Sequence, residues 1–401
     1  MHSTRRVGRP WLAVALLLAL PACGDDSDHQ HKTYTFGLLM VGPYNDQGWS
    51  QANYEAGKYV LSELPDANMV YIDKVNAADR PGTTPAQLAE QLLVQGAKLI
   101  IFSSDDMKEG ANEFARAHPD TYVIMTAGDQ VWQAGHNYVA TPNMVNIMGR
   151  MQYMKMVGGC AAALTTQTGK IGYLGPLIND ETRRLAASAY LGAKYCWTQY
   201  LRRDAAQLSF KVRWIGFWFN IPGVTLDPTQ VAKDFFNGSY DVVFPGIDTT
   251  EALSEAKKLH DAGQSAWALS YNYAGGCDSA PDVCVGVPYF NWGPAYLATI
   301  KTAVNGTWQS NFQWNLPDWS NINNPDTSAV GFIKGQAIGG DASAKLDQLI
   351  GEMGRGLNLW AGPLSLQDGT LYVADGEAAT DQQIWYLPQL LMGMEGESVL
   401  Q

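Results

Sequence analysis

Long hydrophobic runs are absent from this sequence. No apolar stretch in its 401 residues reaches the roughly 18 residues that a membrane-spanning helix needs. Positive charge is scarce as well, because 27 Lys and Arg stand against 39 Asp and Glu, a formal net charge of −12. No basic stripe is present that could follow a phosphate backbone. The sequence therefore offers no membrane span and argues against nucleic acid as a partner.

The usual motifs of catalysis are also missing. The chain has no Gly-x-Ser-x-Gly elbow, no His-Glu-x-x-His pair, no Walker-type loop and no Gly-x-Gly-x-x-Gly after a strand. In the part expected to fold, the histidines are His118, His136 and His260, at predicted helix ends and in a loop. Few histidines are therefore available for a Ser-His-Asp arrangement. We expect a binding protein without metal or cofactor, and a pair of carboxylates is the catalytic arrangement left open.

Cysteine is sparse and forms no recognisable pattern. None of the five cysteines belongs to a Cys-x-x-Cys pair, so zinc and thioredoxin-type chemistry have no support. Cys277 and Cys284 are separated by six residues of turn-rich sequence, and an exported compartment would permit a disulfide between them. Cys160 lies in the apolar run 157–164 and is expected to be a buried free thiol.

The N-terminus carries an export signal. Three arginines precede the apolar stretch 11–20, and small residues then lead into Cys23. This pattern is typical of a signal peptide over 1–22, and the cysteine resembles the acylated residue of a bacterial lipoprotein. Residues 23–32 are polar and are expected to form a tether. We expect lipidation of Cys23 and attachment to a membrane, outside the cytoplasm. The alternative is a secreted protein in which Cys23 is incidental.

From residue 33 onward, short apolar runs alternate with longer amphipathic segments, which is typical of βα units around parallel sheets. In the first half the predicted strands span 36–41, 69–75, 98–103 and 122–126, and the helices span 49–61, 86–95 and 107–117. The second half is expected to hold a long helix over 143–165, strands over 170–174, 210–217, 241–244 and 266–270, and helices over 181–200, 229–236 and 249–262. Beyond these we expect a strand over 283–287, an irregular stretch over 307–326, and helices over 293–304, 344–353 and 381–391.

The pattern predicts an α/β protein of two lobes, each a parallel sheet flanked by helices. A ligand cleft is expected between the lobes, at the carboxyl ends of the strands. The first lobe is expected to comprise 33–142 plus about 272–290, and the second 143–271 plus about 291–395. The place of residues 306–395 is left open.

Polar and aromatic residues follow several predicted strands, where ligand contacts arise in open α/β sheets. Candidates of this kind are Asn45, Asp46 and Trp49 after the first strand, Asp106 after the third, and Asp248 and Asn272 in the second half. A carboxylate or amide can bind sugar hydroxyls or base nitrogens, and tryptophan can stack on a flat ring. Helix capping is the alternative for Asp46 and Asp106, and core packing is the alternative for Trp49.

Six ordered segments then carry a resemblance that covers nearly the whole chain after the tether. They read GPYNDQGWSQANYEAG, KLIIFSSDDMKEGANEFARAHPDTYVIMTAG, GGCAAALTTQTGKIGYLG, SYDVVFPGIDTTEALSEAKKLHDAG, VPYFNWGPAYLATIKTAVNGTWQS and WAGPLSLQDGTLYVADGE. The chain resembles the basic membrane protein family. These lipoproteins are the substrate-binding components of ABC importers and have the type I periplasmic binding protein fold, and several members bind purine nucleosides.

The resemblance extends to individual residues. Trp49, Glu181, Arg184, Asp248 and Trp292 match the family pattern and are implied to contact the ligand. The chain departs from the pattern with Asn53-Tyr54 after the first tryptophan and with Asp105-Asp106 after the third strand, so the ligand itself is less closely defined. For Arg184 the alternative is a solvated helix face, paired with Glu181 at i, i+3.

Together these features predict a membrane-anchored substrate-binding protein that captures a purine nucleoside or nucleobase for the membrane subunits of an ABC importer. Two alternatives stay open. One is a nucleoside hydrolase in which Asp46, Asp106 or Asp248 holds water, and the other is a sensory receptor that serves no importer.

Overall fold

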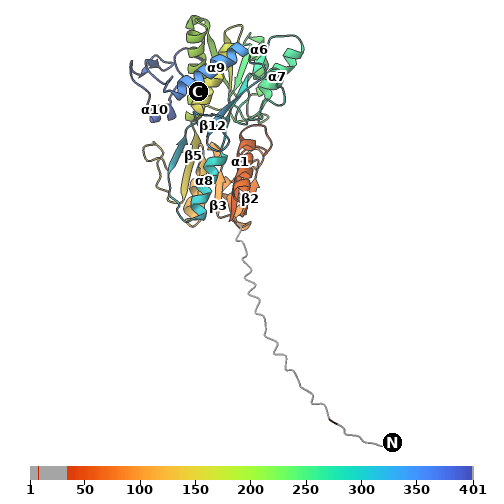
Figure 1. Cartoon of the computed structure of the whole chain (residues 1–401), viewed down its shortest axis with the longest axis vertical. Coiled ribbons are helices and arrows are strands. Elements are labelled where there is room, and N and C mark those ends of the chain that lie inside the picture. The colour runs from red at the N-terminus through yellow and green to blue at the C-terminus, as the bar shows by residue number, and fades with distance from the viewer. Residues whose placement is uncertain (1–7, 9–33, 400–401) are drawn as a thin grey trace, which may run out of the picture. The chain divides into compact units, whose positions relative to one another are not determined.

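A computed structural model describes Gly8 and residues 34–399 of the chain. The elements described below belong to the compact unit Thr33–Gln401 (Figure 1). The predicted signal peptide, apart from Gly8, and the predicted tether with Cys23 lie outside the described residues. No helix within residues 34–399 is long and apolar enough to cross a membrane.

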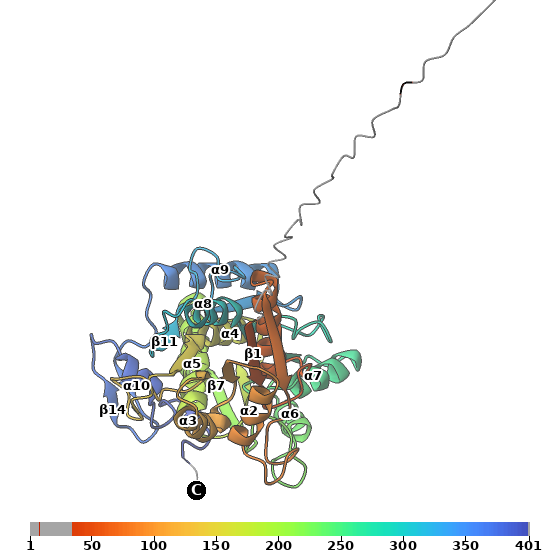
Figure 2. The same cartoon turned by 90° about the horizontal axis from the view of Figure 1, so that it is seen from below.

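The first sheet has six parallel strands in the order β11-β5-β4-β3-β1-β2. They are β1 (Tyr34–Leu39), β2 (Ala67–Ile72), β3 (Leu99–Phe102), β4 (Tyr122–Thr126), β5 (Met144–Gly149) and β11 (Phe312–Asn315). The helices around this sheet are α1 (Trp49–Glu63), α2 (Pro85–Val94), α3 (Lys108–Ala117) and α8 (Gly293–Val304). Helix α1 packs against α8, and Figure 2 shows α8 on one side of β1 and α2 and α3 on the other. Because helices cover both faces, a central strand such as β3 is apolar and buried along its whole length.

The second sheet has five parallel strands in the order β15-β7-β6-β8-β9. They are β6 (Lys170–Gly175), β7 (Ser209–Trp214), β8 (Val242–Pro245), β9 (Trp267–Ala268) and β15 (Met394–Glu395). Its helices are α4 (Met151–Thr165), α5 (Asp180–Tyr195), α6 (Pro228–Asn237) and α7 (Glu251–Asp261). Helix α4 packs along α5, and α6 packs against α7. In Figure 1, α6 and α7 lie at the opposite end of this unit from β2 and β3.

Smaller elements complete the fold. They are the antiparallel pair β10 (Gly286–Phe290) and β12 (Val330–Lys334), the antiparallel pair β13 (Leu364–Ser365) and β14 (Leu371–Val373), α9 (Gly340–Gly354), α10 (Asp381–Trp385), two 3₁₀ turns (Asp105–Met107 and Ala205–Gln207) and a π-helical turn (Cys196–Tyr200). The chain leaves the first sheet after β5, returns to it at β11, and joins the second sheet again at β15. Each sheet is therefore built from separate stretches of sequence, while the boundaries of the two lobes stay a prediction.

Two glycines allow α4 and α5 to pack closely. A Cβ atom at Gly159 would overlap the carbonyl oxygen of Ala189, and one at Gly192 would overlap that of Met156. Any larger residue would push the helices apart, since the obstacle is backbone that cannot move by a change of rotamer. The contact brings the second half of α4 alongside the second half of α5.

The four cysteines within residues 34–399 are paired in two disulfides. Cys160 of α4 is bonded to Cys196, directly after α5, with their Cα atoms 5.3 Å apart. The prediction of a free thiol at Cys160 is therefore wrong, because helix packing creates a contact that a separation of 36 residues conceals in the sequence. Cys277 and Cys284, between which the sequence permits a disulfide, are bonded as well, with their Cα atoms 5.6 Å apart.

Three predicted segments differ from the structure. The helix over 143–165 is wrong in its first part, where Met144–Gly149 forms β5, because valine and isoleucine favour a strand in a run whose periodicity is ambiguous. The irregular stretch over 307–326 contains β11, whose aromatic residues alternate with polar ones. Helix α10 ends at Trp385 rather than near 391, since Pro388 disfavours the helical conformation of the residue before it.

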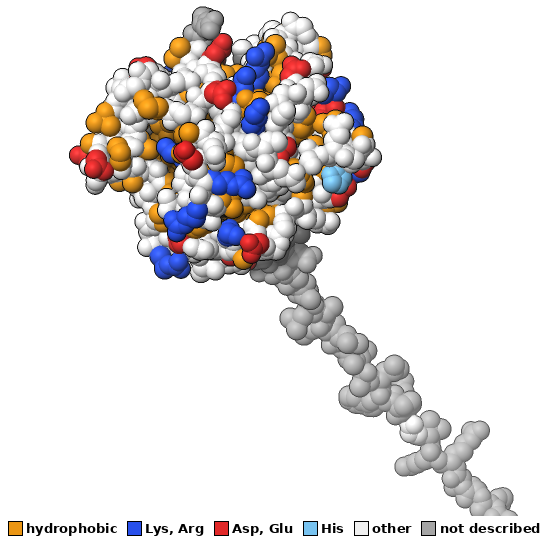
Figure 3. Space-filling view, turned by 90° about the horizontal axis from the view of Figure 1, so that it is seen from above, with side chains coloured by type: hydrophobic (Ala, Val, Ile, Leu, Met, Phe, Trp, Pro, Cys, Tyr) orange, Lys and Arg blue, Asp and Glu red, His pale blue; other side chains and the backbone are white. Residues whose placement is uncertain are grey.

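Charges on the face seen in Figure 3 are mixed. Lys and Arg side chains stand among acidic and uncharged ones, and no continuous basic stripe crosses this face.

Candidate ligand-binding site

A cavity lies where residues of both sheets and of the connecting segments meet. From the first sheet and its helices it is lined by Trp49, Ser104, Asp105 and Ala127. The second sheet, its helices and their loops contribute Tyr173, Pro176, Glu181, Thr182, Leu185, Trp218, Gly246 and Asp248, and the segment after β9 contributes Tyr271 and Asn272. Most of these residues follow the carboxyl ends of strands, where open α/β sheets bind their ligands.

The two sides of the cavity touch at the start of α1. A Cβ atom at Gly48 would overlap the carbonyl oxygen of Asp248, so only glycine permits this approach. The carboxylate of Asp46 accepts hydrogen bonds from the backbone N–H groups of Gly48, Ser50 and Gln51 at 2.8, 3.0 and 2.9 Å. Asp46 thus fixes the loop that leads into α1 and does not line the cavity. This agrees with the alternative interpretation of Asp46 as a helix-capping residue.

Aromatic rings form much of the cavity wall. Trp49 donates its indole N–H to the carbonyl oxygen of Ser103 and packs edge-on against Phe290 and Trp292, with ring centroids 5.2 and 5.3 Å away. Trp218 donates its indole N–H to Asp106 at 3.0 Å. Each indole is therefore held in one orientation before any ligand arrives. Fixed rings of this kind suit a flat, unsaturated ring system.

Hydrogen-bond acceptors occupy another part of the wall. The side-chain N–H of Asn272 donates to Asp248 at 2.9 Å, whereas its own carbonyl oxygen is buried and has no hydrogen-bond partner. Both residues are at most 5% exposed. A buried acceptor without a partner is costly, so a ligand that supplies N–H or O–H groups here would be stabilised.

Two carboxylates of this region, Glu181 and Asp248, are buried. Burial raises the pKa of Glu181 to about 7 and the pKa of Asp106 to about 6, and it raises the pKa of Asp248 well above its ordinary value. Burial also raises the pKa of Asp105, although the nearby Lys108 ammonium, 2.8 Å from the carboxylate, opposes the shift. Carboxylates with raised pKa values cluster at functional sites.

Lys155 of α4 is a buried cation behind the cavity wall. Its ammonium group donates to the carbonyl oxygen of Pro245 at 3.0 Å and lies 3.2 Å from the centre of the Tyr271 ring. Burial lowers the pKa of Lys155 well below its ordinary value, while Glu181 and Asp248 act in the opposite direction. The lysine supports the tyrosine from behind, a role that its place within an apolar helix does not reveal in the sequence.

The structure brings some of the predicted site residues together. Trp49, Glu181, Asp248 and Asn272 line the cavity. Arg184 is 1% exposed and lies in an adjoining space, so the alternative of a solvated helix face is wrong. The remaining candidates lie elsewhere, with Asp106 behind Trp218, Trp292 behind Trp49, Asp46 at the start of α1 and Asn45 exposed.

Ten lining residues were not among the candidates, and four of these ten are acidic or aromatic. Asp105 and Trp218 follow strands β3 and β7. The expectation that ligand contacts lie at the carboxyl ends of strands could therefore have found them. Tyr271 follows β9 in the same way. Tyr173 lies inside β6, where nothing in an apolar strand marks one residue as facing a cavity.

A cavity lined by residues from two parallel α/β sheets is typical of a two-lobed binding protein. A profile of PnrA-like ABC transporter substrate-binding proteins, the Bmp family, matches residues 34–317. The chain belongs to this family, which comprises binding proteins rather than enzymes.

Relatives cover most of the chain. A purine-binding protein of Brucella abortus is 26% identical over 358 residues, 89% of this chain and 91% of the relative. A protein of Haloferax volcanii, provisionally named a glucose-binding protein of an ABC transporter, is 22% identical over 82% of this chain and 75% of its own length. The crystal structure of an ABC transporter solute-binding protein of Aeropyrum pernix matches with a TM-score of 0.64 at 13% identity, over 83% of this chain and 93% of that one. The predicted type I periplasmic binding protein fold is confirmed.

Proposed function

We propose that this ABC transporter solute-binding protein captures a purine nucleoside or nucleobase and presents it to the membrane subunits of an importer. The observation that carries the proposal is the cavity between the sheets, which is lined by fixed aromatic rings, by carboxylates and by Asn272, whose buried carbonyl oxygen has no hydrogen-bond partner. The family gives the transport role, and the purine-binding relative supports the choice of ligand.

The charge of the cavity supports an uncharged ligand. Asp105, Glu181 and Asp248 line it, and none of its lining residues is Lys or Arg. A phosphate group would face carboxylates without a compensating cation, whereas N–H and O–H groups would find acceptors. The site therefore favours a nucleoside or base over a nucleotide.

Capture follows from contacts that exist only when both sides of the cavity are together. Trp49 comes from the first sheet's helix α1, and Asp248 follows β8 of the second sheet. A ligand that contacts both residues stabilises the closed arrangement over an open one by those contacts. No covalent step is needed, and release follows when the lobes separate.

A calorimetric titration tests the ligand. Inosine, guanosine, adenosine and their free bases are the candidate ligands, with glucose and adenosine monophosphate as comparisons. We expect at least one purine to bind at a single saturable site, and we expect the monophosphate to bind at least ten-fold more weakly than adenosine because it places an anion among carboxylates. Chromatography of the mixture should show no free base released from a nucleoside.

Two outcomes of this experiment would contradict the proposed function. Saturable binding of glucose with no response to any purine would move the ligand to another class. Steady release of base in proportion to protein concentration, lost in Asp248→Asn, would favour the nucleoside hydrolase.

We further propose that the protein is anchored by a lipid on Cys23. The proposal rests on the charged, apolar and small residues that precede this cysteine in the sequence. Cys23→Ser should leave the protein in the soluble fraction or unprocessed, while its ligand affinity stays unchanged once the variant is purified. Cell fractionation and mass spectrometry of the mature chain measure the effect. A processed Cys23→Ser chain that still sediments with membranes would show that the anchor is elsewhere.

A further inference from the structure

A second cavity adjoins the one described above. Asp105, Ala127 and Glu181 line both cavities, so the two spaces meet at these residues. Arg184 and Trp385 line only the second cavity. A flat ring held in the first cavity would therefore present one edge toward the second.

Arg184 is unusual among the buried groups of the second cavity. It is 1% exposed, and its Nε and Nη2 atoms have no hydrogen-bond partner. Its guanidinium carbon lies 4.1 Å from the centre of the Trp385 ring, so an aromatic face supports the cation without accepting its hydrogen bonds. A guanidinium group has donors only, and buried donors are rarely left unpaired in native proteins.

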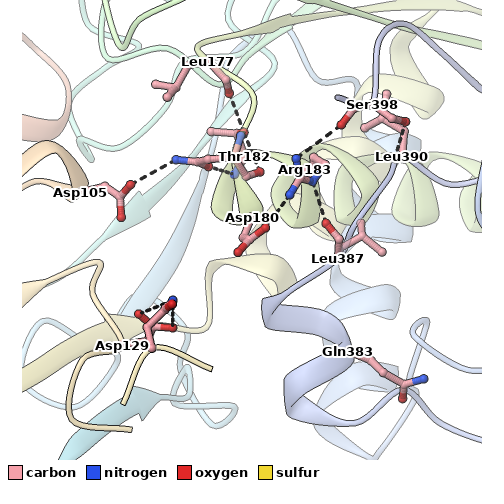
Figure 4. Close-up of polar contacts among 12 residues, drawn as sticks. Asp105, Asp129, Leu177, Asp180, Thr182, Arg183, Gln383, Leu387, Leu390 and Ser398 are labelled. Atoms are coloured by element: carbon pink, nitrogen blue, oxygen red, sulfur yellow. Dashed lines mark hydrogen bonds and ion pairs between the residues drawn. The ribbon is translucent and has the colours of Figure 1, made fainter. Parts of the chain in front are cut away.

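The neighbouring arginine, Arg183, has hydrogen-bond partners within the protein. Arg183 donates from Nε to the carbonyl oxygen of Leu387 at 2.7 Å and forms an ion pair with Asp180. Figure 4 shows Arg183 turned toward these partners and toward Ser398. The same helix thus fixes one arginine to the protein, whereas the next one lines the second cavity and keeps its buried Nε and Nη2 atoms without a partner.

Other carboxylates near the second cavity are already engaged. Asp105 binds Lys108 at 2.8 Å, and Asp129 accepts hydrogen bonds from Tyr386 and, at 3.1 Å, from Asn137. Figure 4 places Asp105 and Asp129 in this region, beside the start of α5. Glu181, one turn before Arg184 on α5, lines both cavities and has no such ion pair among the described residues.

We propose that Arg184 and Glu181 together bind the lactam edge of a 6-oxopurine, so that the protein prefers hypoxanthine- or guanine-type ligands to adenine-type ones. The proposal rests on the proposed function, purine binding, and adds a preference for one class of purine. Arg184 donates to the carbonyl oxygen at C6, and Glu181 accepts from the adjacent N1–H. An adenine ring would point its 6-amino donors at the unpaired guanidinium donors, which leaves both groups unsatisfied. Asp248 and Asn272, which line only the first cavity, remain free for ribose hydroxyls.

The test removes the carbonyl oxygen and the guanidinium in turn. Calorimetry compares inosine, adenosine and purine riboside, which carries hydrogen at C6, on the wild type and on Arg184→Met. The wild type should bind inosine at least ten-fold more tightly than the other two. Arg184→Met should weaken inosine binding at least ten-fold and change purine riboside binding less than two-fold. Arg213→Met, at an exposed position of β7, should bind all three like the wild type.

Equal affinities of the wild type for inosine and purine riboside would overturn the proposal, as would an equal loss for all three ligands in Arg184→Met. If Arg184→Met does not fold, the comparison of the three ligands on the wild type decides alone. If no purine binds the wild type at all, the proposed function fails together with this inference. Purine binding without preference for the carbonyl overturns the inference only.

Discussion

Asp248→Ala and Trp49→Ala are each expected to weaken the binding of a purine nucleoside by ten-fold or more. Asp248 is buried beside Asn272, and leaving a hydrogen-bonding group of the ligand unpaired at a buried position costs about 1–3 kcal/mol. Stacking of a base on an aromatic ring contributes about 1–3 kcal/mol. Since about 1.4 kcal/mol corresponds to a factor of ten in affinity, each loss should be plain in a calorimetric titration.

Matched variants separate binding from folding in this experiment. Asp248→Asn keeps the shape and one acceptor and should lose less affinity than the alanine variant. Asp234→Ala removes an exposed carboxylate on α6 and should bind like the wild type. Thermal unfolding without ligand shows whether the variants are folded. Normal affinity in folded Asp248→Ala and Trp49→Ala would place the ligand elsewhere.

Trp292→Ala is expected to lower the free energy of unfolding by about 3–5 kcal/mol, the range for truncation of a buried tryptophan. Trp292 is 2% exposed, stacks on Phe290 with ring centroids 4.6 Å apart and supports Trp49 edge-on. Its indole N–H has no hydrogen-bond partner, so the loss should come from packing alone. Urea unfolding of the ligand-free protein measures it.

Trp292→Phe is the matched control, because phenylalanine can keep the stack on Phe290 and should lose less stability than alanine. Ligand binding should also weaken in Trp292→Ala, through the loss of support for Trp49. A variant that loses less than about 1 kcal/mol of stability but binds ten-fold more weakly would show instead that Trp292 touches the ligand, as the family resemblance implies.

The sequence predicted the two sheets because their strands carry strong local signals. Residues 99–102 are apolar throughout and follow a glycine, and the structure buries all of them in β3. Strand β5 escaped prediction because its apolar residues run into those of α4, and periodicity alone does not separate a buried strand from a buried helix. The disulfide of Cys160 depends on helix packing, which no local pattern encodes.

Residues of the candidate site could be predicted from the sequence only where they follow the carboxyl end of a strand. Asp248 and Asn272 follow strands of the second half, and the structure places both at the cavity. Lys155 and Tyr173 could not be found this way, because both lie within regular elements whose neighbours are apolar. For Arg184 the sequence left two alternatives, and burial against Trp385 decides against the solvated one.

The edge strands β11 and β15 come from late in the chain, yet they complete sheets whose central strands come much earlier. During synthesis, therefore, neither sheet can close until most of the polypeptide has left the ribosome. The winding of the chain between the sheets thus makes the pairing of each of these edge strands a late step, because it must wait for the C-terminal part of the chain.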